Sequence, residues 1–303
     1  MKKYFLFLGL STVITTIALV SCKNGGGDTV ALKFNFQPGS KYQYTMSTKL
    51  NIEQTVMGAS IKIGQDMLMA STYTIAAADG SNKKISVNYD RIAMKSDNNY
   101  MPMEFDSADS TKQNDILKGI GKMINQPFNV VVSEKGEVIS VEGLDKVING
   151  MVDTTKPNQK QQKALLSQQM SDSSVKASMQ QSFNVYPDKP VKPGDIWTKT
   201  YTVPMANIIM KVESEYKLTS IDKGIAHIDV NSKMTSLSST NPAMKELKIE
   251  MTGTQKGTTD MEISSGLITS NKLIMDIKGK LNVTGTEVPM NLNGTITLTG
   301  IKK

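Results

Sequence analysis

Cysteine, histidine and tryptophan are almost absent from this chain of 303 residues, which has one of each. With Cys22 as the only cysteine, no internal disulfide can form, so the fold depends on a buried core. With His227 as the only histidine, multi-histidine zinc sites are excluded. His227 stands between the apolar residues Ala226 and Ile228, so we expect it on the solvent face of a strand, without a catalytic role.

The patterns that mark common catalytic sites are missing too. The glycine triplet 25–27 precedes no helix start, so it does not resemble a phosphate-binding loop. The acidic residues between 97 and 109 lack the spacing of an EF-hand calcium loop, and no serine stands in a nucleophile-elbow pattern. We therefore predict that the protein is not an enzyme and has no metal or cofactor.

The formal net charge is modest at +7, and the lysines are spread along the chain. Two of these charges, Lys2 and Lys3, stand at the N-terminus before an apolar run that ends near Val20. A dispersed charge of this size argues against nucleic acid as a partner. Residues 1–21 have the layout of a bacterial secretory signal, and no second apolar stretch is long enough to span a bilayer.

The end of this leader, Leu19-Val20-Ser21-Cys22, resembles the lipobox of bacterial lipoproteins. The resemblance implies that residues 1–21 are removed and that Cys22 carries acyl chains such as palmitate, each buried methylene contributing roughly 0.8 kcal/mol to membrane binding. A plain signal anchor and ordinary secretion are the alternatives. Residues 22–29 would form a flexible, glycine-rich tether.

The residues that follow Cys22 also indicate the membrane to which the protein is sorted. The residue after Cys22 is Lys23 rather than aspartate, and no acidic cluster follows. By resemblance to lipoprotein sorting rules, this favours the periplasmic face of the outer membrane, with the cell surface as the alternative.

From residue 30 onward the chain alternates between apolar and polar residues with a period of two, most clearly over 41–56. This alternation predicts long antiparallel strands with one buried face. Over 85–94 the alternation changes phase, which predicts a β-bulge near Asp90 and Arg91. Helical spacing appears over 115–125 and 144–151, and a polar helix is expected over 157–183, with a candidate break at 171–174.

Three pairs of segments predict an internal duplication. Residues 38–42 match 193–197, residues 73–75 match 216–218, and residues 133–136 match 264–266, always in the same order. We therefore expect a first β repeat over 30–142 with a short helix at 115–125, a helical insert over 143–184, and a second β repeat over 185–303.

These turn and strand motifs also carry a family resemblance. The runs 38–42, 55–58, 89–92, 134–138 and 186–197 resemble a family of Bacteroidota lipoproteins that is known only as a domain of unknown function. The resemblance implies a compartment and a lineage, and it implies no active residue.

Methionine is abundant, with 20 in the chain, whereas aromatic residues make up only 6%. Methionine adapts its shape to its neighbours, so it serves either as core filler or as the lining of a groove for apolar ligands. The candidates for such a lining occupy inward positions of predicted strands: Met46, Met210, Met234, Met251 and Met275.

We expect a mainly β protein of the α+β class, with about eleven strands in one long curved antiparallel sheet or half-barrel under covering helices. This architecture is similar to that of the LolA/LolB lipoprotein carriers; two separate β lobes are the alternative. Two functions remain open: binding of a lipid or another apolar ligand beneath the helices, or a structural or assembly role through a protein partner.

Overall fold

The computed structural model describes the residues listed at the end of this paragraph, and within them the chain forms one sheet and a few short helices. No helix in these ranges is long and apolar enough to cross a membrane. Cys22 and the predicted leader and tether up to residue 28 lie outside them, as does most of the predicted helix 157–170. The described residues are 29–56, 58–77, 80–98, 102–112, 118–151, 163, 167, 170–205, 208–239, 248–283 and 286–303.

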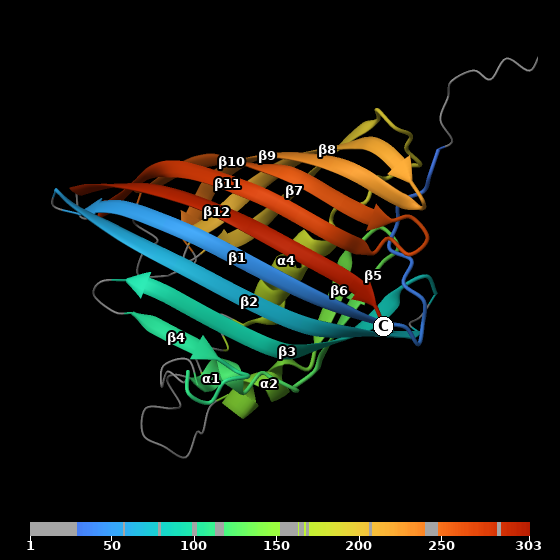
Figure 1. Ribbon diagram of the computed structural model, residues 1–303, viewed down its shortest axis with the longest axis horizontal. Helices are drawn as coiled ribbons and strands as arrows, with labels where there is room; N and C mark the ends of the chain where they lie inside the picture. The colour runs from blue at the N-terminus through green and yellow to red at the C-terminus, as the bar shows by residue number, and fades with distance from the viewer. Residues whose placement is uncertain are drawn as a thin grey trace, which may run out of the picture.

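Twelve strands form a single antiparallel sheet in the order β6-β5-β3-β2-β1-β12-β11-β10-β9-β8-β7, with β4 also paired to β3. The two arms of this sheet meet where β1 pairs with β12, and its edges are β6 and β7 (Figure 1). One sheet confirms the curved-sheet prediction and makes the two-lobe alternative wrong. The strands are β1 (Lys41–Val56), β2 (Ala59–Ala77), β3 (Lys83–Asn98), β4 (Met103–Asp106), β5 (Phe128–Val132), β6 (Val138–Glu142), β7 (Ile196–Met205), β8 (Ile208–Asp222), β9 (Ile225–Ser239), β10 (Lys248–Glu262), β11 (Ile268–Val283) and β12 (Thr286–Lys302).

The bulge predicted in the third strand is present. Ala70 of β2 pairs with Arg91, whereas the next residue, Ser71, pairs with Tyr89. The extra residue is therefore Asp90, which shifts the inward row of β3 from odd to even positions. Its carboxylate accepts a hydrogen bond of 2.7 Å from the Thr72 hydroxyl.

Glycines allow β10, β11 and their neighbours to pack closely in the curved sheet. A Cβ at Gly257 would lie 1.8 Å from the Lys272 carbonyl oxygen, and one at Gly279 would lie 1.9 Å from the Glu250 carbonyl oxygen. Only glycine permits so close an approach, and glycines in strand interiors are a usual source of bending in large sheets.

Helix α4 (Asp172–Phe183) contacts both edge strands, β6 and β7, although these lie at opposite ends of the strand order. Figure 1 shows α4 behind β1 and β12, inside the curve of the sheet. The Gln180 side chain provides hydrogen-bond partners for backbone groups at the free edge of β6. Its amide oxygen accepts from the Val138 N–H, and its amide nitrogen donates to the Gly136 carbonyl, both at 2.8 Å. The helix therefore joins the two edges of the open sheet.

Three of the segments predicted to be helical contain helix within the described residues. Helix α1 covers Lys118–Gly121, and the following turn ends at Asn125, which has a φ of 59°. Helix α2 (Leu144–Met151) agrees with the prediction and buries its apolar face. Helix α4 begins at the predicted break, because Ser171 caps it by accepting a hydrogen bond of 3.2 Å from the Ser174 N–H.

An N-terminal strap, residues 30–36, crosses the end of the sheet and ties the two arms together. Val30 pairs with Val191 ahead of β7. The Phe34 N–H donates to the Glu134 carbonyl in the β5–β6 turn at 2.9 Å, and the Asn35 N–H donates to the Ser265 carbonyl in the β10–β11 turn at 2.8 Å. The sequence pattern predicted mostly β structure from residue 30 onward; the strap is not a strand of the sheet and instead connects turns on opposite arms.

The segments that suggested duplication have the same local geometry in both arms. The N–H groups of Gly39 and Gly194 donate to the Ile75 and Leu218 carbonyls at 2.8 and 2.7 Å. In the same hairpins, Tyr42 pairs with Tyr73, and Trp197 pairs with Tyr216. The predicted repeats contain β1–β6 and β7–β12, and the predicted insert contains α2 and α4; common ancestry of the two repeats stays a prediction.

Candidate functional site

The concave face of the sheet is filled near the strap by an aromatic cluster, which we define as Phe34, Phe36, Tyr42, Phe183 and Tyr186. All five are buried. The rings of Phe36 and Tyr42 stack with centroids 4.1 Å apart, and Phe34 meets Phe183 edge-on at 5.4 Å. The Tyr186 hydroxyl donates to the Gly266 carbonyl at 2.9 Å. The strap and α4 thus close this end with packed rings.

Further along the strands, the concave face carries a methionine cluster that contains four of the five predicted ligand-lining methionines. Each of the four is at most 3% exposed. They pack with Val203, Val212, Ile277 and Leu292 in one group. Their inward direction agrees with the period-two pattern, but they behave here as core residues. The four are Met210, Met234, Met251 and Met275.

The fifth residue, Met46, lies apart from them in what we call the methionine patch. Met46 of β1 pairs with Met69 of β2, and Met67 of β2 pairs with Met94 of β3. All four side chains face the concave side, and all are only half-buried. Sequence analysis missed three of them, although the spacing of Met67 and Met69 places both on one face of a strand.

Two tyrosines lie beside the patch on the same face. Tyr73 and Tyr89 point inward from β2 and β3, and burial raises the pKa of both hydroxyls. Even so, both side chains remain partly accessible to a water-sized sphere. The two rings therefore continue the partly accessible surface of the methionine patch toward the aromatic cluster.

A row of polar side chains crosses the concave face between the two clusters. Lys199 of β7 pairs with Ser214 of β8, Ser214 with Ser232 of β9, and Ser232 with Gln255 of β10. Directly paired residues point to the same face of a sheet, so these four form one line, which we call the polar row. Ser214, Ser232 and Gln255 are buried. Sequence analysis missed the row because it exists only once the strand registers are known.

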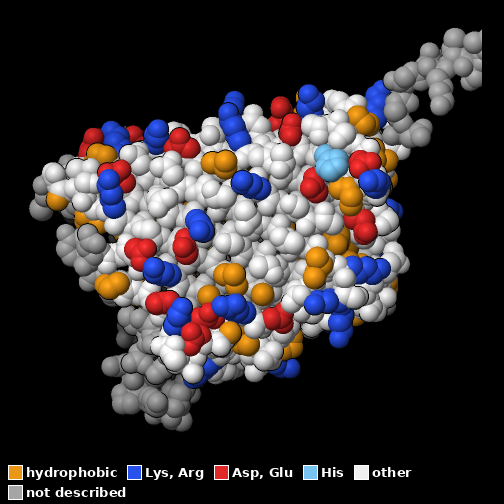
Figure 2. Space-filling model, viewed as in Figure 1, with side chains coloured by type: hydrophobic (Ala, Val, Ile, Leu, Met, Phe, Trp, Pro, Cys, Tyr) orange, Lys and Arg blue, Asp and Glu red, His pale blue; other side chains and the backbone are white. Residues whose placement is uncertain are grey.

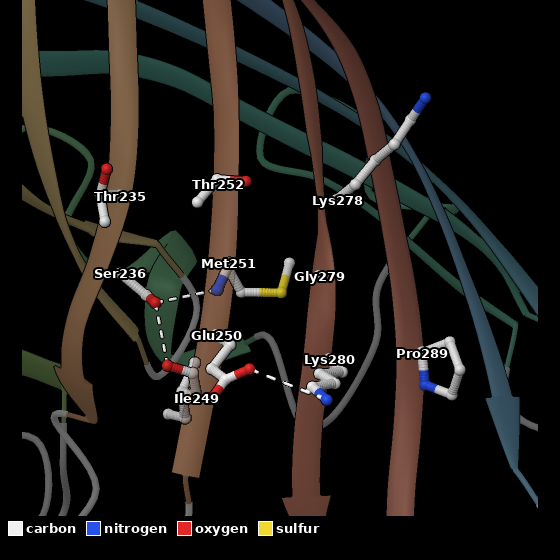
Figure 3. Close-up of a pocket in the computed structure, with 10 residues that line it drawn as sticks. All are labelled: Thr235, Ser236, Ile249, Glu250, Met251, Thr252, Lys278, Gly279, Lys280 and Pro289. Atoms are coloured by element: carbon white, nitrogen blue, oxygen red, sulfur yellow. Dashed lines mark hydrogen bonds and ion pairs between the residues drawn. The ribbon is translucent and has the colours of Figure 1, made fainter.

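Two hollows open on the outer face. The larger, about 630 Å³, lies near the ends of β9–β12 and is lined mainly by outward side chains such as Glu250, Thr252 and Lys278. Figure 3 shows the Met251 sulfur pointing toward Gly279 and the ion pair between Glu250 and Lys280, whose charged atoms are 3.8 Å apart. The smaller hollow, about 260 Å³, is rich in paired charges, including Lys112 with Glu104.

His227 lies on the outer face, as predicted, with the flanking Ala226 and Ile228 buried inside. Its Nδ1 is 2.7 Å from the Asp260 carboxylate on the neighbouring strand β10. Figure 2 shows this histidine on a face where basic and acidic side chains are interspersed. In the part of the chain that the structure describes, no three His, Cys, Asp or Glu side chains gather as a metal site would require.

The family is decided by the sequence match over residues 80–268, which fit the model of DUF6263, a family of unknown function. The chain belongs to DUF6263. The matched segment includes the polar row and helices α1, α2 and α4, whereas the strap, β1 and β2 precede it. No curated protein matches the sequence.

The similarities to the following solved structures are weak. A lipovitellin structure titled for its lipid–protein interactions has 10% identity and a TM-score of 0.47, and the match covers 86% of this chain but only a quarter (25%) of that one. An outer membrane channel from Pseudomonas putida F1 has 5% identity and a TM-score of 0.21, over 88% and 97% of the chains. The translocator domain of autotransporter NalP from Neisseria meningitidis has 7% identity and a TM-score of 0.23, over 88% and 90%.

Proposed function

We propose that this member of DUF6263 is a non-enzymatic bacterial envelope lipoprotein that binds an apolar ligand on the concave face of its sheet, beside the methionine patch. The observation that carries the proposal is the half-buried state of Met46, Met67, Met69 and Met94 on an inward face. A packed β core leaves its inward side chains almost inaccessible, as β8 and β9 do here.

The chemistry of the patch suits a ligand of variable shape. Methionine side chains have three rotatable bonds and a polarizable sulfur, so they adapt to irregular apolar surfaces. Tyr73 and Tyr89 extend the same wall toward the aromatic cluster, and α4 closes the gap between the sheet edges. Small-molecule sites are typically concave and mostly apolar, with few polar groups.

The part of the proposal that concerns the membrane anchor is supported by the sequence alone. Residues 1–21 would be removed and Cys22 acylated, which holds the ligand-binding sheet against the periplasmic face of the outer membrane. The strap begins only a few residues after Cys22, so the acyl chains would hold the closed end of the sheet near the lipid surface.

Ligand binding is tested with the acyl-free mature chain, purified from cells and extracted for mass spectrometry, and then titrated with a fluorescent fatty acid. We expect co-purified lipid and saturable binding. The double variant Met67→Gln and Met69→Gln should weaken binding about tenfold or more, because it places two amides in an apolar wall.

The matched control is Ile274→Gln, which changes an outer-face residue that is 59% exposed and should leave binding unchanged. A ligand-free protein that does not bind the fatty acid would refute the proposed binding. The anchor is tested separately with labelled palmitate: wild-type protein should incorporate it and Cys22→Ser should not, and equal labelling of the two would refute acylation at Cys22.

A further inference from the structure

We propose that the ligand is amphiphilic and that the polar row holds its head group through the side-chain amide of Gln255. This inference rests on the proposed function and adds the ligand's polar end to it.

The polar row is unusual because its surroundings are apolar on both sides. Along β8, Ser214 stands between Val212 and Tyr216, and all three are buried. Along β9, Ser232 likewise stands between buried Val230 and Met234. The row therefore places hydrogen-bonding groups in the middle of a face that is otherwise a hydrophobic core, and such groups destabilise the fold unless each has a partner.

Two members of the row satisfy each other. The hydroxyls of Ser214 and Ser232 are 2.8 Å apart, and the Tyr201 hydroxyl lies 3.3 Å from that of Ser214. Hydroxyl groups both donate and accept, so this chain of three forms a closed local network. The serines therefore require no ligand to explain them.

Gln255 differs from the serines. The residue is 3% exposed, within the described ranges no hydrogen bond involves its amide group, and the amide atoms keep a small accessible surface. The amide offers two N–H donors and one carbonyl acceptor, and buried polar groups in folded proteins nearly always have partners. A ligand head group with acceptor oxygens would supply partners for its two N–H donors.

The position of Gln255 fits a ligand whose tail reaches the methionine patch. From β10, the sheet order runs through β11, β12 and β1 to β2, where Met67 and Met69 lie. At about 4.8 Å per strand, four steps span about 19 Å along the sheet. A single extended acyl chain crosses such a distance, with its head at the row and its tail on the methionines.

Lys199 gives the row a positive end. Its side chain is only 14% exposed, and its ammonium lies 2.9 Å from the carboxylate of Asp188, whose side chain is 76% exposed. An ammonium group on the inner side of an edge strand favours an acidic head group over a basic one at the row. A long-chain fatty acid has the head, charge and length that these groups would recognise.

The test compares two probes that differ only at the head: pyrenedodecanoic acid, which has a carboxylate, and dodecylpyrene, which has none. Both are titrated by fluorescence into the acyl-free mature protein. We expect the acid to bind about tenfold more tightly, as one satisfied buried hydrogen-bonding group would give. Gln255→Leu should abolish this difference by weakening the acid alone.

The matched control is Gln65→Leu, the same substitution at an inward-facing but only half-buried position on β2, outside the row; it should preserve the tenfold preference. Urea unfolding checks the fold of each variant, and Gln255→Met replaces Gln255→Leu if that variant does not fold. If both probes bind wild type equally, or if the preference survives loss of the amide, the head-group assignment is refuted while the binding function stands. If neither probe binds, the proposed function itself is refuted.

Discussion

The two ends of the concave face are built from different side chains. Near the strap, five aromatic residues pack ring against ring, and backbone hydrogen bonds from the strap hold them in place. Away from the strap, the packing depends on methionines, and Tyr201 is the only aromatic residue in that cluster. Aromatic rings have few rotamers and specific contact geometry, whereas methionine adapts. The comparison indicates a rigid closed end and a more adaptable core at the far end.

Truncation of a ring at the closed end should have the largest effect. Phe34 is fully buried between Phe36 and Phe183, so Phe34→Ala should lower the free energy of unfolding by about 3–5 kcal/mol. Urea unfolding followed by circular dichroism measures this. Met69→Ala in the half-buried methionine patch should cost much less, and equal losses at the two sites would contradict the contrast.

The contact between the strap and the β10–β11 turn can be disrupted without changing an aromatic residue. A Cβ at Gly266 would lie 2.1 Å from the Lys33 carbonyl oxygen, and its φ is +76°. Gly266→Ala should therefore destabilise the fold by about 2–4 kcal/mol, combining overpacking with backbone strain. Gly39→Ala is the control, because Gly39 has a similar φ of +83° but nothing within 4 Å; thermal unfolding should show the larger loss at Gly266.

The link between the sheet edges should depend on the Gln180 amide. Gln180→Leu leaves the Val138 N–H and the Gly136 carbonyl without their partner, which should cost about 1–3 kcal/mol. Hydrogen exchange at the Val138 amide should also become faster. Ser182→Ala, at an exposed position on the same helix, is expected to be neutral; faster exchange in this control too would mean that general loosening of α4 is responsible.

The smallest effect is expected where methionine already fills the core. Met251→Leu keeps volume and apolarity, so it should cost less than about 1.5 kcal/mol. Phe36→Leu in the aromatic cluster removes a stacked ring and should cost more. Denaturant midpoints of the two variants give the comparison, and a greater loss at Met251 would show that the methionine cluster is as strictly packed as the rings.

The sequence pattern predicted which residues face inward but not what covers them. Period-two alternation gave β1 with its observed bounds and the bulge at Asp90, because both depend on neighbouring residues alone. The same pattern could not separate buried Met251 from half-buried Met46, since the two differ in what the rest of the sheet places above them. Pairing of β1 with β12 and alignment of Ser214 with Gln255 are long-range registers, which local periodicity does not encode.

The strap has a consequence for the order of assembly. It precedes every strand of the sheet in the sequence, yet the carbonyl that accepts the hydrogen bond from the Asn35 N–H belongs to Ser265, more than 200 residues later. The earliest segment to emerge is thus among the last that can dock, and contacts between such distant residues are slow to form. Until they form, Phe34 and Phe36 have no cavity to enter, so both rings stay exposed until late in folding.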